Sequence, residues 1–192
     1  MLENIMSCQK CNLCHHQSPL LDRPKKNAIM LVGLSAKQTQ IASEIPLDNS
    51  TKSGQLVAFM EKIATQYNLK VYRTNLVKCP PLGPDLILRY PTQTEINTCF
   101  ENILSEIDSL RPQIIILFGN LVQAAFKENL RINVGSVKDC SFPFQQKHRC
   151  YYVASYHPSY VMRSPLRKKR YLENFSALLD TILSSEDNCN VT

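Results

Sequence analysis

Glycine is scarce in this chain, long apolar runs are absent, and no segment is repeated or of low complexity. With 5 Gly and 11 Pro in 192 residues, the composition excludes collagen-like and glycine-rich linker proteins. The longest apolar runs, at residues 29–34 and 114–118, are far shorter than the roughly 18 residues that a membrane-spanning helix needs. Residues 1–10 contain the acidic Glu3 and no apolar segment. We therefore expect no secretory signal peptide, no membrane partner and a cytoplasmic location.

The composition is that of a folded protein with a mild excess of positive charge. Apolar residues make up 44% of the chain, which excludes intrinsic disorder, and 192 residues suit one globular domain. We expect a single domain over residues 1–192, with a cysteine-rich N-terminal arm at about residues 1–26. The formal charge is +6, and the densest basic cluster comprises Arg163, Arg167, Lys168, Lys169 and Arg170. Such a cluster is either the solvated start of a helix or a surface that binds phosphates.

Strand-like and helix-like segments alternate along the chain. Short apolar runs predict buried strands at residues 27–34, 70–77, 114–118 and 149–155. Apolar residues at helical spacing predict helices at residues 53–67, 94–110, around 121–126 and from about 167 to 183. Alternation of this kind predicts an α/β fold, in which helices cover both faces of a parallel sheet. Ligands bind such sheets at the carboxyl ends of the strands, where we expect the segment after Gly33, Asn75 and His157.

Eight cysteines need an explanation in a protein expected in a reducing compartment, where disulfides are rare. Cys8, Cys11 and Cys14 lie within seven residues, a density that packing does not explain. Together with Cys79 and Cys99, they provide enough thiolates for a four-ligand site that holds zinc or an iron–sulfur cluster. In the alternative interpretation, Cys79 and Cys99 are small buried apolar residues and only the N-terminal trio binds a metal. The other cysteines have no partner at ligand spacing and are interpreted as structural or incidental: Cys140, Cys150 and Cys189.

Six blocks, spread over most of the chain, carry a resemblance to a known family. They are CQKCNL at 8–13, LVGL at 31–34, SGQLV at 53–57, VYRTNLVKCPP at 71–81, RPQIIILFG at 111–119 and HPSYVMR at 157–163. In this order they resemble the uracil-DNA glycosylase superfamily, and specifically its iron–sulfur branch, family 4. The resemblance implies a three-layer αβα fold around a mostly parallel four-stranded sheet. It also implies a monomer that binds DNA, flips out a base and excises it by hydrolysis of the N-glycosidic bond, leaving an abasic site.

The resemblance further implies a cofactor and its ligands. In the family, two cysteines of an N-terminal pair and two from the middle of the chain hold a 4Fe-4S cluster. The matching residues here are Cys8, Cys11, Cys79 and Cys99, which leaves Cys14 spare. Zinc is the alternative occupant of the same site.

Two residues acquire catalytic roles through the resemblance, Asn75 and His157. The side chain of Asn75 offers both a donor and an acceptor, which suits the edge of a pyrimidine. His157, fixed by Pro158, would donate a hydrogen bond to the base as negative charge builds on it. Without the resemblance, Asn75 is equally well interpreted as a strand-end residue that binds nearby backbone, and His157 as part of a loop.

The segment SYVMR at residues 159–163 resembles the family loop that enters the minor groove of DNA. Ser159 opens this loop, and Tyr160, Val161 and Met162 would fill the place that the flipped base leaves in the stack. The basic cluster would then neutralise phosphates on either side: Arg163, Arg167, Lys168, Lys169 and Arg170.

The first family motif is where this chain departs from the pattern. The family has Gly-Glu-Ala-Pro-Gly, whose acid orients the attacking water, and the matching residues here are GLSAK at 33–37. A ring that stacks on uracil in the family corresponds to Leu47 when counted from Gly33 and to Asn49 when counted from Gly54. Neither residue is aromatic. The predicted substrate-binding residues are Gly33, Leu34, Ser35, Leu47, Asp48, Asn49, Ser50 and Asn75.

Three hypotheses follow from this departure. The favoured one is a glycosylase for a modified pyrimidine, for example a glucosylated base of phage DNA, because polar residues replace the ring. The second is a slow uracil-DNA glycosylase of base excision repair that relies on expulsion of the base. The third is a catalytically inactive iron–sulfur protein that binds DNA, and the presence of Asn75 and His157 argues against it.

Overall fold

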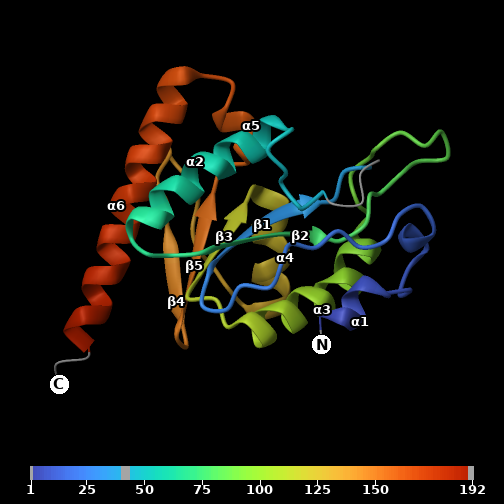
Figure 1. Cartoon of the computed structure of the whole chain (residues 1–192), viewed down its shortest axis with the longest axis horizontal. Coiled ribbons are helices and arrows are strands. Elements are labelled where there is room, and N and C mark those ends of the chain that lie inside the picture. Colours follow the sequence, from blue (N-terminus) through green and yellow to red (C-terminus); the bar gives the residue numbers. More distant parts are fainter. Residues whose placement is uncertain (1, 40–43, 190–192) are drawn as a thin grey trace.

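The computed structural model describes residues 2–39 and 44–189, with side chains up to residue 185. Its strands form one sheet in the order β2-β1-β3-β5-β4 (Figure 1). Strand β1 pairs in parallel with β2 and β3, and β3 pairs in parallel with β5, whereas β4 is antiparallel to β5. The strands are β1 Ile29–Ser35, β2 Val71–Val77, β3 Ile114–Phe118, β4 Phe144–Lys147 and β5 Cys150–Ser155.

Helices cover both faces of this sheet. One apolar core joins α3 and α4 to β1, β2 and β3, and the other joins α2 and α6 to the opposite face. Three layers in the order αβα confirm the predicted fold class. The helices are α1 Glu3–Met6, the 3-10 helix η1 Asn12–His15, α2 Lys52–Gln66, α3 Gln93–Leu110, α4 Asn120–Leu130, α5 Pro158–Val161 and α6 Pro165–Cys189. Within the described residues, none of these helices has the length and apolar character that crossing a bilayer requires.

The sheet has five strands rather than the predicted four, because the sequence gives little sign of β4. Its residues, FQQK, contain a single apolar side chain, and their exposure alternates. A strand at the edge of a sheet with one covered face needs no continuous apolar run. The four strands that the apolar runs predict are β1, β2, β3 and β5.

The start of α2 fixes the loop that precedes it. The hydroxyl of Thr51 caps the helix by accepting a hydrogen bond from the backbone N–H of Gly54 at 2.9 Å. A Cβ on Gly54 would lie only 1.9 Å from the carbonyl oxygen of Asp48, so a glycine is required there. This close approach places residues 47–51 against the carboxyl end of the sheet.

Candidate active site

A cavity of about 360 Å³ opens at the carboxyl ends of the parallel strands. It brings together residues from segments far apart in the sequence, among them Asn75 of β2 and His157, which follows β5. Seven of the predicted catalytic and substrate-binding residues line it: Gly33, Leu34, Ser35, Leu47, Asp48, Asn75 and His157. The remaining lining residues are Leu20, Lys37, Thr51, Ser53, Leu88, Arg89 and Tyr90.

The side chain of Asn75 is held close to the backbone of β1. Asn75 is only 3% exposed and is the register partner of Gly33. A Cβ at Gly33 would lie 2.4 Å from the Oδ1 atom of Asn75 and 3.4 Å from the Cδ2 atom of Leu47. Any larger residue at position 33 would displace the amide, so Gly33 makes room for Asn75 at the cavity wall.

His157 is fixed by hydrogen bonds that also assign its tautomer. Its Nδ1 atom accepts the backbone N–H of Ser159 at 3.2 Å and lies 2.8 Å from the Ser159 hydroxyl. Burial lowers the pKa of His157, which favours the neutral ring. Because Nδ1 is the acceptor, the single ring proton is on Nε2, which is therefore a hydrogen-bond donor. A Cβ at Gly119, whose φ is +85°, would lie 3.5 Å from the Cβ of His157.

A buried arginine holds the part of the wall where the family has an aromatic ring. Arg73 of β2 is 4% exposed, and its Nη1 atom donates to the carbonyl oxygen of Leu47 at 3.0 Å and to Oδ1 of Asn49 at 2.9 Å. Its Nη2 atom donates to Glu61 at 2.6 Å. Leu47 has a φ of +54°, an uncommon conformation for a residue other than glycine. Leu47 lines the cavity in this arrangement, whereas the amide of Asn49 is engaged by Arg73 away from it.

Two predicted substrate-binding residues, Asn49 and Ser50, are absent from the cavity lining. The hydroxyl of Ser50 accepts a hydrogen bond from Lys37 at 3.2 Å, and its backbone N–H donates to Asp48 at 2.8 Å. Both residues are exposed, and their side chains bind Arg73 and Lys37 outside the cavity lining. Counting from Gly33 places the family's stacking ring at Leu47, and counting from Gly54 places it at Asn49. Of these two residues, Leu47 lines the cavity, so the structure favours the count from Gly33.

Part of the cavity mouth belongs to residues 82–90, which we call the apolar loop. The sequence predicts a loop up to Tyr90 after Pro80 and Pro81, but its place at the site was missed. Its backbone is ordered by hydrogen bonds from Gly83 N to Ile87 O and from Arg89 N to Pro81 O, both at 2.9 Å. Arg89 also pairs with Glu95 at the start of α3 at 2.6 Å. Four large apolar side chains are exposed, by 59%, 65%, 50% and 76%: Leu86, Ile87, Leu88 and Tyr90. Apolar residues at helix or strand spacing would predict a helix or a strand. These residues follow neither spacing, so their pattern does not indicate a place at the site.

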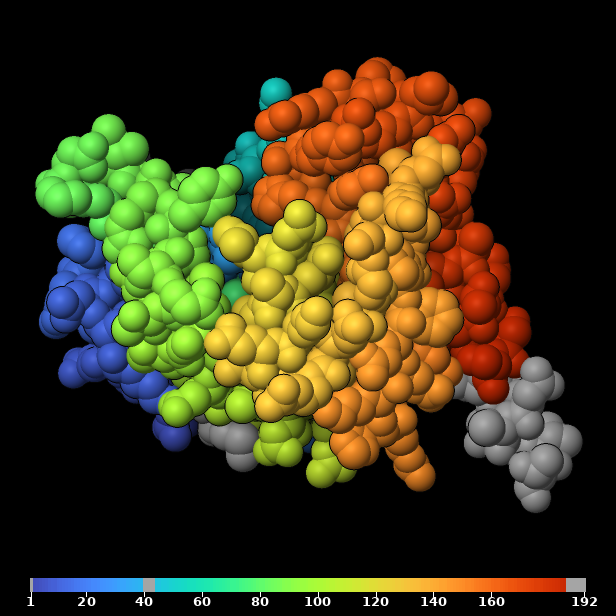
Figure 2. Space-filling view, turned by 180° about the vertical axis from the view of Figure 1, so that it is seen from behind, coloured from blue at the N-terminus to red at the C-terminus, as the bar shows by residue number. Residues whose placement is uncertain are grey.

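The predicted DNA-binding residues lie on α5 and the first turns of α6. The guanidinium of Arg167 lies 4.0 Å from the ring centre of Tyr160, and the ammonium of Lys168 lies 3.6 Å from that of Phe59. Lys169 and Arg170 lie beside the carboxylates of Glu173 and Asp139. Figure 2 shows the apolar loop, in green, projecting at the upper left, and this part of the chain, in orange, at the top of the molecule.

One predicted wedge residue, Val161, is not on the surface. It is fully buried in the core that joins α2 and α6 to the sheet. Residues three or four apart share a helix face, and the one-turn helix α5 directs Val161 inward. Tyr160, 39% exposed, and the partly exposed Met162 present surface instead.

The cysteine arm returns to the sheet beside α3. The amide nitrogen of Asn102 lies 3.6 Å from the Sγ atoms of both Cys8 and Cys99. Burial first, and then the charges of Cys99, Cys11, Cys8 and Cys14, raise the pKa of Cys79 to about 12. These four thiols are therefore within electrostatic reach of Cys79, and we call the five residues together the cysteine site. Across the described residues, no three His, Cys, Asp or Glu side chains are arranged at metal-binding geometry.

A family model, the uracil DNA glycosylase superfamily, matches residues 18–180. The match covers most of the chain, including the cavity, Asn75 and His157. The molecule is therefore of the DNA glycosylase class, enzymes that hydrolyse the N-glycosidic bond between base and sugar. More particularly, the chain belongs to the uracil DNA glycosylase superfamily.

Two relatives within this superfamily are similar over most of their length, and a third over about half of it. The chain is 26% identical over 192 residues to a type-4 uracil-DNA glycosylase of Archaeoglobus fulgidus, covering 93% of this chain and 89% of that protein. It is 26% identical over 196 residues to one of Saccharolobus solfataricus, covering 95% and 85%. A third, of Thermotoga maritima, is 27% identical over 94 residues, or 49% and 46% of the two chains. These relatives support the resemblance to family 4.

Proposed function

We propose that this glycosylase releases a pyrimidine that carries a polar substituent on its ring. The observation that carries the proposal is the cavity wall, where Leu47 occupies the position of the family's stacking ring and Lys37, Asp48 and Ser53 are polar. A leucine stacks less well on a flat base than a ring does, and short polar side chains suit hydroxyl groups. A glucosylated or otherwise hypermodified base of phage DNA has this chemistry.

Asn75 and His157 would carry the recognition and the chemistry. Asn75 offers its amide to the hydrogen-bonding edge of the flipped base, and its burial beside Gly33 keeps it in place. As the N-glycosidic bond breaks, its electron pair moves to the base, and Nε2–H of His157 stabilises that charge. A water molecule then adds to the sugar carbon and gives up a proton, and the departing base takes up a proton.

We assign the orientation of that water to Asp48. The family uses an acid of the first motif for this task, and the matching position here is Leu34. Among the described residues, Asp48 supplies the one carboxylate of the cavity wall. Hydrogen bonds from the backbone N–H and side chain of Ser50 lower the pKa of Asp48, so it is a carboxylate at neutral pH.

Replacement of Asp48 by Asn tests this assignment. Because an amide does not accept a proton from water, single-turnover base release should fall by ~10²-fold or more, as on loss of a general base. Affinity for DNA should stay within about twofold, since no phosphate contact is removed. A rate equal to that of the unchanged enzyme would show that another group orients the water.

DNA would lie across the cavity mouth, between α5 and the apolar loop. Tyr160 and Met162 on one side and Ile87 and Tyr90 on the other present apolar surface next to the opening. Apolar side chains of this kind fill the gap that a flipped nucleotide leaves. The basic residues at the start of α6 would bind phosphates beside them.

The donor chemistry of the cysteine site suits an iron–sulfur cluster, and we propose that Cys8, Cys11, Cys79 and Cys99 hold a 4Fe-4S cluster there. The donor set is all sulfur, and N–H groups of Asn102 and Lys78 lie within hydrogen-bond distance of Cys99 Sγ. When bound, the cluster would supply a cross-link between the N-terminal arm and α3. Iron and sulfide at about four per chain in anaerobically purified protein are expected. Stoichiometric zinc without iron would instead assign the site to zinc.

The substrate proposal is tested with duplex DNAs that carry uracil or one of a panel of larger modified pyrimidines. Mass analysis of the released bases should show faster release of a substituted pyrimidine than of uracil. Uracil is the second candidate, favoured by the type-4 relatives, which are named uracil-DNA glycosylases. Rapid release of uracil and of no larger base would establish that second candidate.

A further inference from the structure

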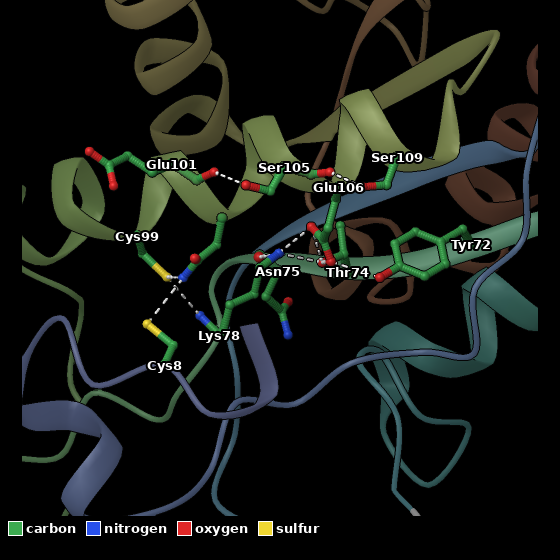
Figure 3. A network of polar contacts seen from close by, with 11 residues as sticks. Cys8, Tyr72, Thr74, Asn75, Lys78, Cys99, Glu101, Ser105, Glu106 and Ser109 are labelled. Carbon is green, nitrogen blue, oxygen red and sulfur yellow. Dashed lines mark hydrogen bonds and ion pairs between the residues drawn. The ribbon is translucent and has the colours of Figure 1, made fainter. Parts of the chain in front are cut away.

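An ion pair lies completely inside the protein, behind the cavity wall. Lys78 directly follows β2, Glu106 belongs to α3, and both side chains are 0% exposed (Figure 3). Neither residue lines the cavity. Charged side chains are almost never fully buried unless they are paired, and burying them is costly. None of the catalytic steps proposed for Asn75, His157 and Asp48 uses this pair.

Every hydrogen-bonding group of the pair is satisfied. The ammonium of Lys78 donates to Glu106, to the hydroxyl of Thr74 at 2.6 Å and to the carbonyl oxygen of Asn75 at 2.7 Å. Glu106 also accepts hydrogen bonds from Thr74 at 3.0 Å and from the Tyr72 hydroxyl at 2.7 Å. Burial, and then the charge of Glu106, raise the pKa of Tyr72, so its hydroxyl keeps the proton that it donates.

The third partner of Lys78 connects the pair to the cavity. Asn75 is the residue whose side chain meets the base, and β2 is an edge strand that pairs only with β1 among the described strands. Lys78 folds back along this edge and binds the main chain of Asn75 directly. The direction of a side chain depends on the orientation of its own peptide units, so this bond helps set where the Asn75 amide points.

The same lysine also contacts the cysteine site. Its backbone N–H lies 3.4 Å from the Sγ atom of Cys99, and Cys79 is the next residue in the chain. One residue thus lies between the thiols on one side and the base-recognising asparagine on the other. Figure 3 shows Cys8 and Cys99 beside the backbone of Lys78 and Asn75 beyond it.

We propose that Lys78, held by Glu106, is a positioning residue for Asn75, and that it ties the geometry of the base-recognition site to the cysteine site. The inference rests on the proposed role of Asn75 in base recognition. General stability does not require a buried ion pair, because apolar replacements are often neutral or stabilising. The contact with the Asn75 carbonyl provides a specific reason for a charge at this position.

A variant cycle separates positioning from stability. Lys78→Met combined with Glu106→Gln removes both charges, keeps the volumes similar and leaves an acceptor for Tyr72. Its single-turnover release of the preferred base should fall by ~10-fold to 100-fold, the effect of a misplaced recognition group. In an Asn75→Ala background, the same two substitutions should change the rate by less than about twofold, because their target is gone.

Tyr72→Phe is the matched control, because it removes a hydrogen bond of Glu106 without touching Asn75. It should lower the melting temperature and leave base release unchanged. If the Lys78/Glu106 variant does not fold, the apolar pair Lys78→Leu with Glu106→Leu replaces it in the cycle. Two results would overturn the inference. One is a rate loss from the Lys78/Glu106 substitutions that is just as large in the Asn75→Ala background, and the other is no rate loss when Asn75 is intact. Absence of base release from every DNA by the unchanged enzyme would instead overturn the proposed function.

Discussion

Two regions of the molecule are built in different ways. The inner wall is the part of the cavity wall around Asn75 and Leu47, and what we call the outer wall is the surface of α5 and the start of α6, outside the cavity lining. On the inner wall, Asn75 and Leu47 are each bound through a carbonyl oxygen by a buried cation of the β2 segment, Lys78 at 0% and Arg73 at 4% exposure. On the outer wall, the cations are partly exposed and rest on rings, as Arg167 does on Tyr160. Salt screens exposed charges, which therefore hold neighbouring groups in place only weakly, whereas buried charges are screened much less. If the function proposed above holds, we expect the inner wall to act on the choice of base and the outer wall on the affinity for DNA.

The largest expected effect concerns the donor at the inner wall. His157→Ala should lower single-turnover base release by ~10²-fold to 10³-fold, because the hydrogen bond from Nε2 strengthens only as charge reaches the base. DNA affinity should hardly change. Ser159→Ala is the control, since the backbone N–H that binds Nδ1 is retained. Equal rates for the His157→Ala and unchanged enzymes would exclude this role for His157.

The identity of the base should depend on Leu47. Leu47→Phe supplies the missing ring, and stacking on an aromatic side chain is worth ~1 to 3 kcal/mol per base. We expect the release ratio of uracil to the larger pyrimidine to rise by about tenfold or more in competition assays. Asn49→Ala, at a position outside the cavity lining, should leave this ratio unchanged. If Asn49→Ala changes this release ratio and Leu47→Phe does not, the position of the stacking ring corresponds to Asn49 and not to Leu47.

Charge on the outer wall should act on affinity alone. Arg163→Ala with Lys168→Ala should weaken binding to all DNA sequences alike and reduce the salt slope by ~1 for each phosphate that the protein no longer neutralises. Lys169→Ala with Arg170→Ala should have a smaller effect, because these residues already lie beside Glu173 and Asp139. Binding isotherms at several salt concentrations measure both. A salt slope that neither pair alters would place the phosphates elsewhere.

The smallest effect is a pH dependence of stability from His157. Burial lowers its pKa below the ordinary 6.5, so above pH 6.5 the ring is neutral in both states and contributes nothing. Below pH 6.5 the unfolded chain takes up the proton first, which destabilises the folded state. Between about pH 7.5 and about pH 5.5, the melting temperature should therefore fall more for the unchanged protein than for His157→Gln. Equal falls would show that His157 does not contribute.

The apolar patterns predicted the sheet and helices well because burial on two faces leaves a continuous apolar run. Ile114–Phe118 is an example, with all five residues buried. They could not predict β4, whose exposed edge needs no such run. They also could not place the apolar loop at the cavity mouth, because its residues follow no helix or strand period. Phe59 belongs to the helix predicted at residues 53–67, yet it is 38% exposed, and the ammonium of Lys168 lies over its ring.

Within the site, residues carried by strand ends were predictable and residues placed by side-chain contacts were not. Asn75 and His157 follow directly from strand positions and the family pattern. Asn49 and Ser50 have the same polar character as Asp48, but they are exposed outside the cavity lining, where Arg73 and Lys37 bind their side chains. Such long-range partners leave no trace in local sequence.

The convergence of five thiols from distant segments also sets an order of events during synthesis. Cys8, Cys11 and Cys14 leave the ribosome early, but Cys99 belongs to α3, past the midpoint of the chain. At ~5 to 20 residues per second, about 4 to 17 seconds separate the synthesis of Cys14 and Cys99. During this interval the N-terminal thiols have neither their partners nor the β2 edge along which Leu20 and Asp22 later bind. A metal or cluster that needs Cys99 as well as the N-terminal thiols is therefore bound only after more than half of the protein has been made.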